Sequence, residues 1–325
     1  MTSAPRRLRG LICAPAWVAT IALVTALSVA NTAAAESDAE PGAAGDATLA
    51  QWTLKGPLPG AVSRATDDLP LSDQAGSEGW VLDAATSDEF NGDTLNDELW
   101  MPRHRSWRGR APALFSEENV EVRDGRLRLW MRKNGAPRGD ANPDYHTYTS
   151  AAVHAKKRTL YGYYEVRAKP MASAGSSSFW FAGTSDGWRT EIDVFELGGK
   201  AEGHENRVNM NLHVFWTPED RSHRNWGGVW KAPRPLADDF HVYGLAWTPE
   251  RITYYVDGSP VRWVDNGYWH QPIYTIFDSE TMPDWLGTPE DDDLPSVYEI
   301  DYLRVWRKPV KRQAGLSRPG GNATR

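Results

Sequence analysis

The stretch Thr190-Glu191-Ile192-Asp193-Val194-Phe195-Glu196 sets three carboxylates into a short β-branched and aromatic run. Such a run favours a β-strand. Side chains alternate along a regular strand, so Glu191 and Asp193 share one face, whereas Glu196, an odd step away, points to the other. A β-bulge around Val194-Phe195 inserts one residue and returns Glu196 to the first face. The strand is therefore expected to line one groove with three acids.

This crowding of acids indicates a chemical purpose, because like charges on one strand face repel and a structural strand rarely tolerates them. Retaining glycoside hydrolysis needs one carboxylate as nucleophile and a second, about 5–5.5 Å away, as proton donor and later as base. We assign Glu191 as the nucleophile, Glu196 as the acid/base, and Asp193 as an electrostatic helper whose charge raises the pKa of its neighbour. For this spacing taken alone, a solvated acidic edge strand is the equal alternative.

The flanks of the acidic strand resemble glycoside hydrolase family 16, and the resemblance spans roughly residues 80–307. It implies a β-jelly roll of two curved antiparallel sheets with a concave substrate groove, a bulged acidic strand, and the same roles for the three acids. The segments that carry it, in the order of the family, are Asp88-Glu89-Phe90-Asn91-Gly92, Gly162-Tyr163-Tyr164-Glu165-Val166-Arg167, Ser178-Phe179-Trp180-Phe181 and Ile300-Asp301-Tyr302-Leu303-Arg304-Val305-Trp306.

Independently of that resemblance, the pattern of the chain predicts an all-β sandwich. Short β-rich runs recur between turn signals, helical periodicity is nearly absent, and Asp124-Gly125 and Asp257-Gly258 are typical hairpin turns. Besides residues 190–196, the predicted strands are Val120–Val122, Arg126–Arg132, Tyr161–Lys169, Ser177–Ala182, Val208–Trp216, His241–Trp247, Ile252–Val256, Pro260–Val264, Tyr274–Phe277 and Val297–Trp306.

The remaining segments predict a secreted protein with one folded domain. Residues 1–35 combine arginines, an apolar run and an Ala-x-Ala site, which is typical of a signal peptide rather than a membrane anchor. Residues 36–79 read as a linker or loosely ordered N-terminal arm, 80–308 as the catalytic domain and 309–325 as a disordered tail. We expect an extracellular or periplasmic monomer.

Composition excludes several classes of function. The single cysteine, Cys13, lies in the signal segment, so disulfides, zinc–thiolate sites and cysteine catalysis are excluded from the mature chain. That chain carries 43 Asp and Glu against 33 Lys and Arg, after the three signal-peptide arginines are removed from 36, a net charge of about −10. Such a field repels polyanions at long range and gives no support to nucleic-acid binding.

The chain contains 16 tryptophans, an abundance typical of polysaccharide grooves, where aromatic faces stack on the apolar faces of sugars. Trp130, Trp247 and Trp306 follow strand alternation and are expected in the core. Four others lie in loop-like sequence and are favoured for substrate binding, namely Trp107, Trp188, Trp226 and Trp230. On the strand at 208–216, polar residues alternate with apolar ones and favour a polar stripe beside the site. The predicted substrate contacts are Trp107, Arg108, Arg110, Trp180, Trp188, His213, Asn211 and Trp226.

Within the family, residues 107–115 together with 118–120 and 124–127 look like the red-algal galactan enzymes, the β-agarases and porphyranases. The acidic net charge favours neutral agarose, and the arginine-rich loop 103–110 leaves sulfated porphyran open. We therefore expect a β-agarase. Porphyranase, carrageenase, laminarinase and transglycosylase activities are alternatives, as is a non-catalytic carbohydrate-binding jelly roll, although a binding relic would be expected to have lost one of the acids.

The resemblance also implies one structural calcium ion away from the groove, and no cofactor for catalysis. Asp301 matches the side-chain ligand of the family, with backbone oxygens near Glu89 and Gly125 as partners. Calcium takes six to eight oxygen ligands, and the sequence offers one good candidate. A local cap or ion pair of Asp301 is the equal alternative.

Overall fold

The computed structural model describes residues 49–133 and 144–309 of the chain. The predicted signal peptide at 1–35, the first part of the predicted arm and all but the first residue of the predicted tail lie outside the described residues. Within the described ranges, no helix has both the length and the apolar character needed to cross a membrane.

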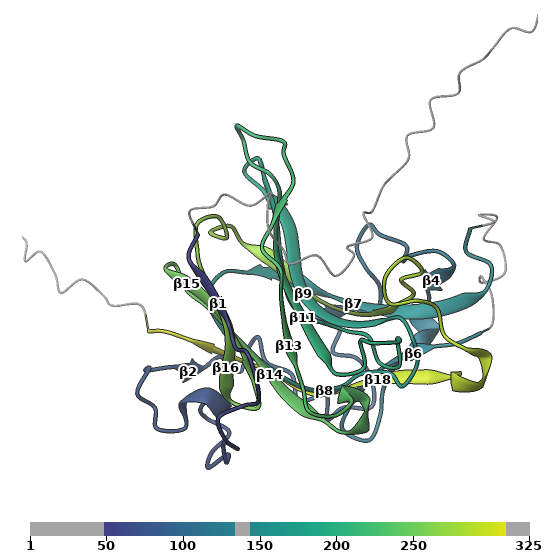
Figure 1. Cartoon of the computed structure of the whole chain (residues 1–325), viewed down its shortest axis with the longest axis horizontal. Helices are drawn as coiled ribbons and strands as arrows, with labels where there is room; N and C mark the ends of the chain where they lie inside the picture. The colour runs from purple at the N-terminus through teal and green to yellow at the C-terminus, as the bar shows by residue number, and fades with distance from the viewer. Residues whose placement is uncertain (1–48, 134–143, 310–325) are drawn as a thin grey trace, which may run out of the picture. The chain divides into compact units, whose positions relative to one another are not determined.

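Eighteen strands of the described residues form two nine-stranded sheets (Figure 1). The first, which we call the site sheet, has the order β12-β11-β10-β9-β17-β7-β3, with β13 beside β11 and β4 beside β7. The second, the support sheet, has the order β1-β16-β15-β14-β8-β18-β6-β5, with β2 beside β18. All strand pairs are antiparallel except β4 with β7.

The strands of the site sheet are β3 (Trp100–Met101), β4 (Ala113–Phe115), β7 (Tyr148–Thr159), β9 (Ser176–Ser185), β10 (Trp188–Leu197), β11 (Arg207–Trp216), β12 (Arg224–Asn225), β13 (Gly228–Lys231) and β17 (Ile273–Glu280). Those of the support sheet are β1 (Gln51–Thr53), β2 (Val81–Leu82), β5 (Val120–Val122), β6 (Leu127–Met131), β8 (Gly162–Lys169), β14 (His241–Trp247), β15 (Arg251–Val256), β16 (Ser259–Asp265) and β18 (Ser296–Arg307). Short 3-10 helices are η1 (Leu71–Asp73), η2 (Glu117–Asn119), η3 (Leu236–Asp238) and η4 (Asp291–Asp293).

The hydrophobic core fills the space between the two sheets. On β9, Phe179 and Phe181 are fully buried, while the alternate side chains face the opposite side of the sheet. Phe195 of β10 crosses the core, with its ring 5.9 Å from that of Phe179 and 4.4 Å from that of Tyr243 on β14. Aromatic packing between two antiparallel sheets confirms the predicted all-β sandwich.

Each strand predicted from the sequence is present, and β9 and β17 are longer than predicted. In both predicted hairpins the Asp and the Gly have positive φ, 54° and 69° at Asp124-Gly125, as the tightest hairpin turns require. The sequence did not predict β7, a central strand of the site sheet, because its Ala, Ser and Lys residues have low β-propensity.

The prediction of a linker or loose arm is wrong for residues 49–79, the described part of that segment. β1 pairs with β16 at the edge of the support sheet, and Gly56 accepts a 3.0 Å hydrogen bond from the indole nitrogen of Trp230. Leu71 in η1 is 6% exposed, so it is a core residue. Three further leucines of the arm pack against the core, namely Leu49, Leu54 and Leu58. The Ala, Gly and Pro content of the arm concealed these few apolar anchors.

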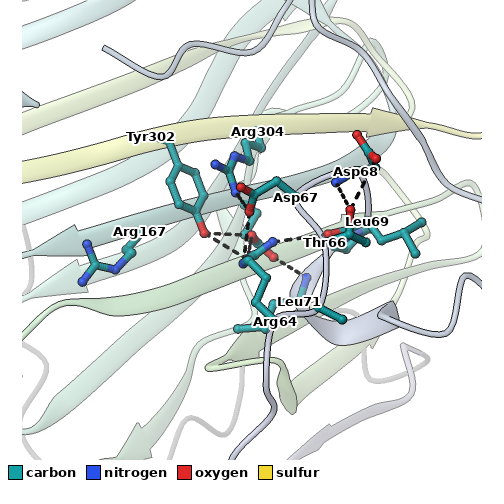
Figure 2. Close-up of polar contacts among 12 residues, drawn as sticks. Arg64, Thr66, Asp67, Asp68, Leu69, Leu71, Arg167, Tyr302 and Arg304 are labelled. Carbon is teal, nitrogen blue, oxygen red and sulfur yellow. Dashed lines mark hydrogen bonds and ion pairs between the residues drawn. The ribbon is translucent and has the colours of Figure 1, made fainter. Parts of the chain in front are cut away.

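One buried carboxylate fastens the arm to the support sheet. Glu165 of β8 is fully buried, ion-pairs with Arg64, and accepts hydrogen bonds from the Tyr302 hydroxyl at 2.9 Å and the Leu71 amide at 2.7 Å. Figure 2 shows Arg64 and Leu71 of the arm beside Tyr302 of β18. Burial raises the pKa of Glu165, and Arg64 opposes this shift. A charge without such a partner would be costly in the interior, so Arg64 is structurally required.

We expect Arg64→Ala to lower the free energy of unfolding by about 3 kcal/mol, because it leaves Glu165 buried without its cation. Urea denaturation followed by tryptophan fluorescence measures the loss. The double variant Arg64→Ala/Glu165→Gln should recover part of it, because no charge is then left unpaired. Arg123→Ala, an exposed arginine of the 124–125 hairpin, is the control. An unchanged midpoint for Arg64→Ala would show that the ion pair between Arg64 and Glu165 contributes nothing to stability.

Candidate active site

A cavity of about 670 Å³ opens on the face of the site sheet that points away from the core. Its floor comes from β9, β10 and β17, and one wall comes from the loop at 103–110. The carboxylate-bearing residues that line it are Glu191, Asp193 and Glu196 of β10 and Glu280 of β17. We call this cavity the groove.

The bulge in β10 is what brings the three acids of that strand together. Glu191 pairs with Ala182 on β9 and His213 on β11, and the register is regular as far as Asp193. Between Asp193 and Glu196 the register shifts by one residue against β11, and the shift against β9 falls between Asp193 and Phe195. Val194 and Phe195 are both buried, so the extra residue turns Glu196 back to the groove. The predicted bulge is confirmed.

The acids of β10 hold protons unequally. Burial, followed by the charge of Asp193, raises the pKa of Glu191 to about 8, and His213 and Arg189 oppose the rise. Burial and Asp193 also raise the pKa of Glu196, well above its usual range. Asp193 is 3.1 Å from the Nε2 atom of His213. Glu191 therefore ionises before Glu196, which gives the two groups different protonation states over a range of pH.

A second pair of carboxylates, which the sequence interpretation missed, enters from β17. Asp278 is 1% and Glu280 3% exposed, and the two share a strand face by alternation. Trp180 donates its indole hydrogen to Asp278 at 3.1 Å, and the Nε atom of Arg110 lies 2.9 Å from Glu280. Burial, with Arg110 opposing, raises the pKa of Glu280 to about 6. Four carboxylates from two strands thus line the groove, and a fifth, Asp278, is buried next to them under Trp180.

An aromatic cluster forms the floor of the groove beside Asp193. The His104 ring lies parallel to Trp180 with centroids 5.9 Å apart, and Trp107 meets Trp180 edge-on at 6.4 Å. The Nδ1 atom of His104 accepts the Trp107 amide hydrogen at 2.9 Å. Burial, then His154 and Arg105, lowers the pKa of His104 to about 4, so the ring is neutral and its proton is assigned to Nε2. The floor offers an aromatic face and a hydrogen-bond donor.

Three exposed arginines give the groove a cationic rim. Arg105 and Arg158 lie over the ring of Tyr274, 4.8 and 5.0 Å from its centroid, and Arg189 lies 4.5 Å over Phe215. Within the described ranges, none of these three arginines forms an ion pair with a carboxylate. Their charges are therefore free to meet an anionic ligand.

Comparison with known protein families identifies the family of this chain. The family model described as "Beta-porphyranase A-D, GH16 domain" matches residues 80–308 of the chain. The chain belongs to glycoside hydrolase family 16. It is an endo-glycosidase of the porphyranase, carrageenase and laminarinase type. The resemblance read from the flanking motifs is confirmed.

Individual members of family 16 support the assignment. The β-porphyranase E of Zobellia galactanivorans is 32% identical over 250 residues, which cover 70% of this chain and 88% of that protein. The kappa-carrageenase of Pseudoalteromonas carrageenovora is 30% identical over 76% of this chain and 70% of that protein. The crystal structure of porphyranase B from Z. galactanivorans superposes with a TM-score of 0.63 at 26% identity, over 70% of this chain and 92% of that one.

The structure of this family 16 chain brings several predicted substrate contacts to the groove. Trp107, Arg110 and Trp180 line it. His213 and Asn211 are not among its lining residues: His213 lies 3.1 Å from Asp193 with 16% of its side chain exposed, and Asn211 pairs with Asp193 across the sheet. Arg108 lies outside the lining, 5.5 Å over the ring of Tyr145.

Three tryptophans that the sequence favoured for substrate binding do not line the groove. Trp226 is 4% exposed and packs on Trp269 at 5.4 Å, and Trp230 is 2% exposed. Trp188 begins β10 and meets Tyr268 at 6.4 Å, away from the groove lining. Polar neighbours in sequence suggested loops for Trp226 and Trp230, but they belong to or adjoin the short edge strands β12 and β13, whose inner side chains reach the core.

For one pair of the residues that the sequence interpretation missed, the sequence did contain a usable pattern. Asp278 and Glu280 alternate with core residues at the end of β17, the same period-2 pattern that identified the acids of β10. The predicted strand ended at Phe277 and excluded them. His104, His154 and Arg158 have no comparable local signal, because only the pairing of distant strands and the loop places them together.

The calcium ion that the family resemblance implies does not fit the residues present. Glu89, Gly125 and Asp301 do border one cavity over the support sheet. Asp301, the expected side-chain ligand, is 2.8 Å from Arg167 and 4.0 Å from Arg126. Calcium needs many oxygen ligands with negative charge, and here the carboxylate is already neutralised by guanidinium groups. Figure 2 shows Arg167 and Arg304 on this side of the molecule.

One donor set in the described residues does have metal-ligating composition. Ligand atoms of Glu191, Asp193 and His213 lie within 4.8 Å of one another. A carboxylate–carboxylate–imidazole set suits a divalent transition metal. The same three side chains include the assigned nucleophile and its helper, so a bound metal there would compete with glycoside chemistry.

Removal of divalent cations should leave the melting temperature unchanged, because Arg167 rather than calcium neutralises Asp301. Differential scanning calorimetry with EDTA, and again with millimolar CaCl₂, measures this. Arg167→Ala should lower the melting temperature and create a dependence on calcium, since the carboxylate then lacks its cation. A drop in the melting temperature of the unaltered chain in EDTA would show that a structural calcium is bound after all.

Proposed function

We propose that this family 16 chain is a secreted, retaining endo-hydrolase of β-linked red-algal galactan, and that its galactan carries sulfate. The observation that carries the retaining mechanism is the bulge, which turns Glu191 and Glu196 into one groove with unequal affinities for protons. Double displacement needs such a pair of carboxylates flanking the scissile bond, with the nucleophile opposite the leaving oxygen.

In the proposed mechanism Glu191 attacks the anomeric carbon while Glu196 donates its proton to the leaving oxygen, which breaks the glycosidic bond. The products of this step are a covalent glycosyl-enzyme and a free chain end. Glu196, now ionised, takes a proton from water, and the water oxygen displaces Glu191, so the configuration is retained. Asp193, 3.1 Å from His213, disfavours a second negative charge on its neighbours Glu191 and Glu196.

The rim of the groove supports a sulfated substrate. Net charge favours neutral agarose, but the charge that a bound sugar meets is that of Arg105, Arg158 and Arg189, none of which has a carboxylate partner among the described residues. A guanidinium group binds sulfate through charge-assisted hydrogen bonds. The match to the porphyranase domain adds to this argument. We therefore favour porphyran over the agarose that the sequence suggested.

Secretion and a monomeric state are part of the proposal. The signal peptide that motivates export lies at 1–35, outside the described residues. Polymeric galactan does not cross a membrane, so an endo-acting enzyme must meet it outside the cell or in the periplasm. A transglycosylase would use the same covalent intermediate and differ only in its acceptor, and no feature of the groove favours that outcome.

A substrate panel tests the proposed function. Reducing ends are assayed after incubation with porphyran, agarose, carrageenan and laminarin, and the anomeric configuration of the first product is read by proton NMR. We expect porphyran to be cleaved fastest, by internal cuts, with initial β-anomers. Initial α-anomers would exclude the retaining mechanism, and cleavage of laminarin alone would exclude a galactan.

Glu191→Gln should lower kcat by at least about a thousandfold while leaving the fold intact, because the amide cannot displace the leaving group. Circular dichroism checks the fold, and isothermal titration calorimetry with porphyran oligosaccharides should still detect binding. Glu121→Gln, a partly buried glutamate of β5 in the support sheet, is the control. Near-normal turnover in Glu191→Gln would contradict the assignment of the nucleophile.

Arg105→Gln should raise KM for porphyran oligosaccharides about tenfold, the value of one lost charge-assisted hydrogen bond, and leave KM for agarose oligosaccharides unchanged. Arg103→Gln is the matched control, since Arg103 belongs to the same loop but pairs with Glu117 at 3.4 Å. Steady-state kinetics on both substrates give the comparison. An equal rise in KM for agarose would mean that Arg105 does not recognise sulfate.

A further inference from the structure

One buried ion pair in the groove takes no part in the mechanism above. Glu280 ends β17 with 4% of its side chain exposed, and its carboxylate accepts a 2.9 Å hydrogen bond from Arg110. The backbone oxygen of Arg110 accepts a second bond, from the Thr281 hydroxyl at 2.7 Å. Both ends of Arg110 are thus fixed to the end of β17, so the loop at 103–110 holds its guanidinium against Glu280.

The strand register brings this pair close to the proposed acid/base. Ser178 of β9 pairs with Glu196 on one side and with Asp278 on the other. Neighbouring strands lie about 4.8 Å apart, so Asp278 and Glu196 are roughly 10 Å apart at Cα and their side chains point to the same face. Glu280 follows two residues later on that face and lines the groove with Glu196.

We propose that Glu280, kept ionised by Arg110, holds the neighbouring Glu196 in its protonated form, ready to act as general acid. Glu280 is then a positioning residue, because it acts through Glu196 and not on the sugar. This role rests on the proposed retaining mechanism, in which Glu196 must carry a proton when the substrate binds.

The charges around Glu196 support this role. Carboxylates face it from β10 and β17, Arg110 faces it from the loop, and the neighbours on β9 and β11, Ser178 and Asn209, carry no charge. Burial is the largest cause that raises the pKa of Glu196, and the charges of Asp193 and Glu280 follow. Negative neighbours disfavour a further negative charge, so Glu196 retains its proton.

Asp278, on the same strand face, provides a matched comparison. It is fully buried, accepts a hydrogen bond from Trp180, and has one oxygen without a partner among the described residues. Burial raises the pKa of Asp278 well above its usual range, whereas Arg110 restrains the rise at Glu280. Asp278 therefore gives up its proton less readily than Glu280, and its charge raises the pKa of Glu196 less than the charge of Glu280 does.

The test is the pH dependence of kcat/KM on porphyran oligosaccharides. Loss of activity on the alkaline side reports deprotonation of Glu196, so removing a negative neighbour should move that limb to lower pH. We expect Glu280→Gln to move it down by about one pH unit. Glu280→Asp, which keeps the charge, should restore most of the shift, and Asp278→Asn should move the limb by less than Glu280→Gln does.

Arg110→Gln supplies an independent variant. It removes the cation that keeps Glu280 ionised, so Glu280 should lose its hold on Glu196 and the alkaline limb should move to lower pH. Loss of a cation beside Glu196, with no role for Glu280, would move the limb to higher pH instead. If Glu280→Gln does not fold, as judged by near-ultraviolet circular dichroism, the direction of the Arg110→Gln shift decides the question. A limb that stays in place in the folded variants, with changes only in KM or melting temperature, would overturn the proposal and leave Glu280 as a contact residue.

Glu196→Ala separates this inference from the proposed function. If Glu196 is the acid, its removal should abolish the alkaline limb, and azide should restore turnover of an aryl glycoside whose leaving group needs no proton. A limb that persists in Glu196→Ala would refute the assignment of the acid and this inference together. A limb that disappears in Glu196→Ala but is unmoved in Glu280→Gln would refute this inference alone.

Discussion

The site depends on a change within one strand: after the bulge in β10, the other set of alternate side chains faces the groove. A regular β10 would send Glu196 into the core, where Phe195 now packs on Phe179 and Tyr243. A regular strand with this sequence cannot present both a continuous apolar face toward the support sheet and three acids toward the groove. The bulge after Asp193 allows both. The sandwich fold holds this kink in place, because β9 and β11 pair with β10 on both sides of the shift.

The carboxylates of the groove differ in how readily they give up a proton. Four carboxylates line it and Asp278 is buried next to them, and among the described residues Arg110 is the guanidinium that ion-pairs with one of these acids. So many charges cannot all be ionised in a poorly solvated space, and burial together with the neighbouring carboxylates raises the pKa of Glu196 and of Asp278 well above the usual range. Local differences in burial and in cationic partners decide which carboxylates ionise first, as an enzyme that needs one acid and one nucleophile requires.

The sequence predicted what is local and missed what depends on pairing between distant segments. The β-run, the spacing of Glu191, Asp193 and Glu196, and the Asp-Gly turns all lie within a few residues, and the structure has the strand, the bulge and the hairpins. Glu280 enters the groove only because β17 pairs with β9, and His104 only because a loop folds over Trp180. Trp226 was assigned to the groove from its polar neighbours, yet an edge strand directs it to the core. β7 has too little β-propensity to be recognised without its partners.

The two faces of the molecule treat acids in opposite ways. Over the support sheet, carboxylates are matched to guanidinium groups: Glu165 to Arg64, Asp301 to Arg167 and Glu89 to Arg304. Such pairs hold segments together, as the pairing of Glu165 with Arg64 of the arm shows. In the groove the acids outnumber their bonded cations, and the arginines of the rim lie over aromatic rings instead. Acids without a bonded cation and arginines without a carboxylate partner therefore lie together on the surface where a substrate would bind. The acids can exchange protons there, and the arginines can meet an anionic ligand.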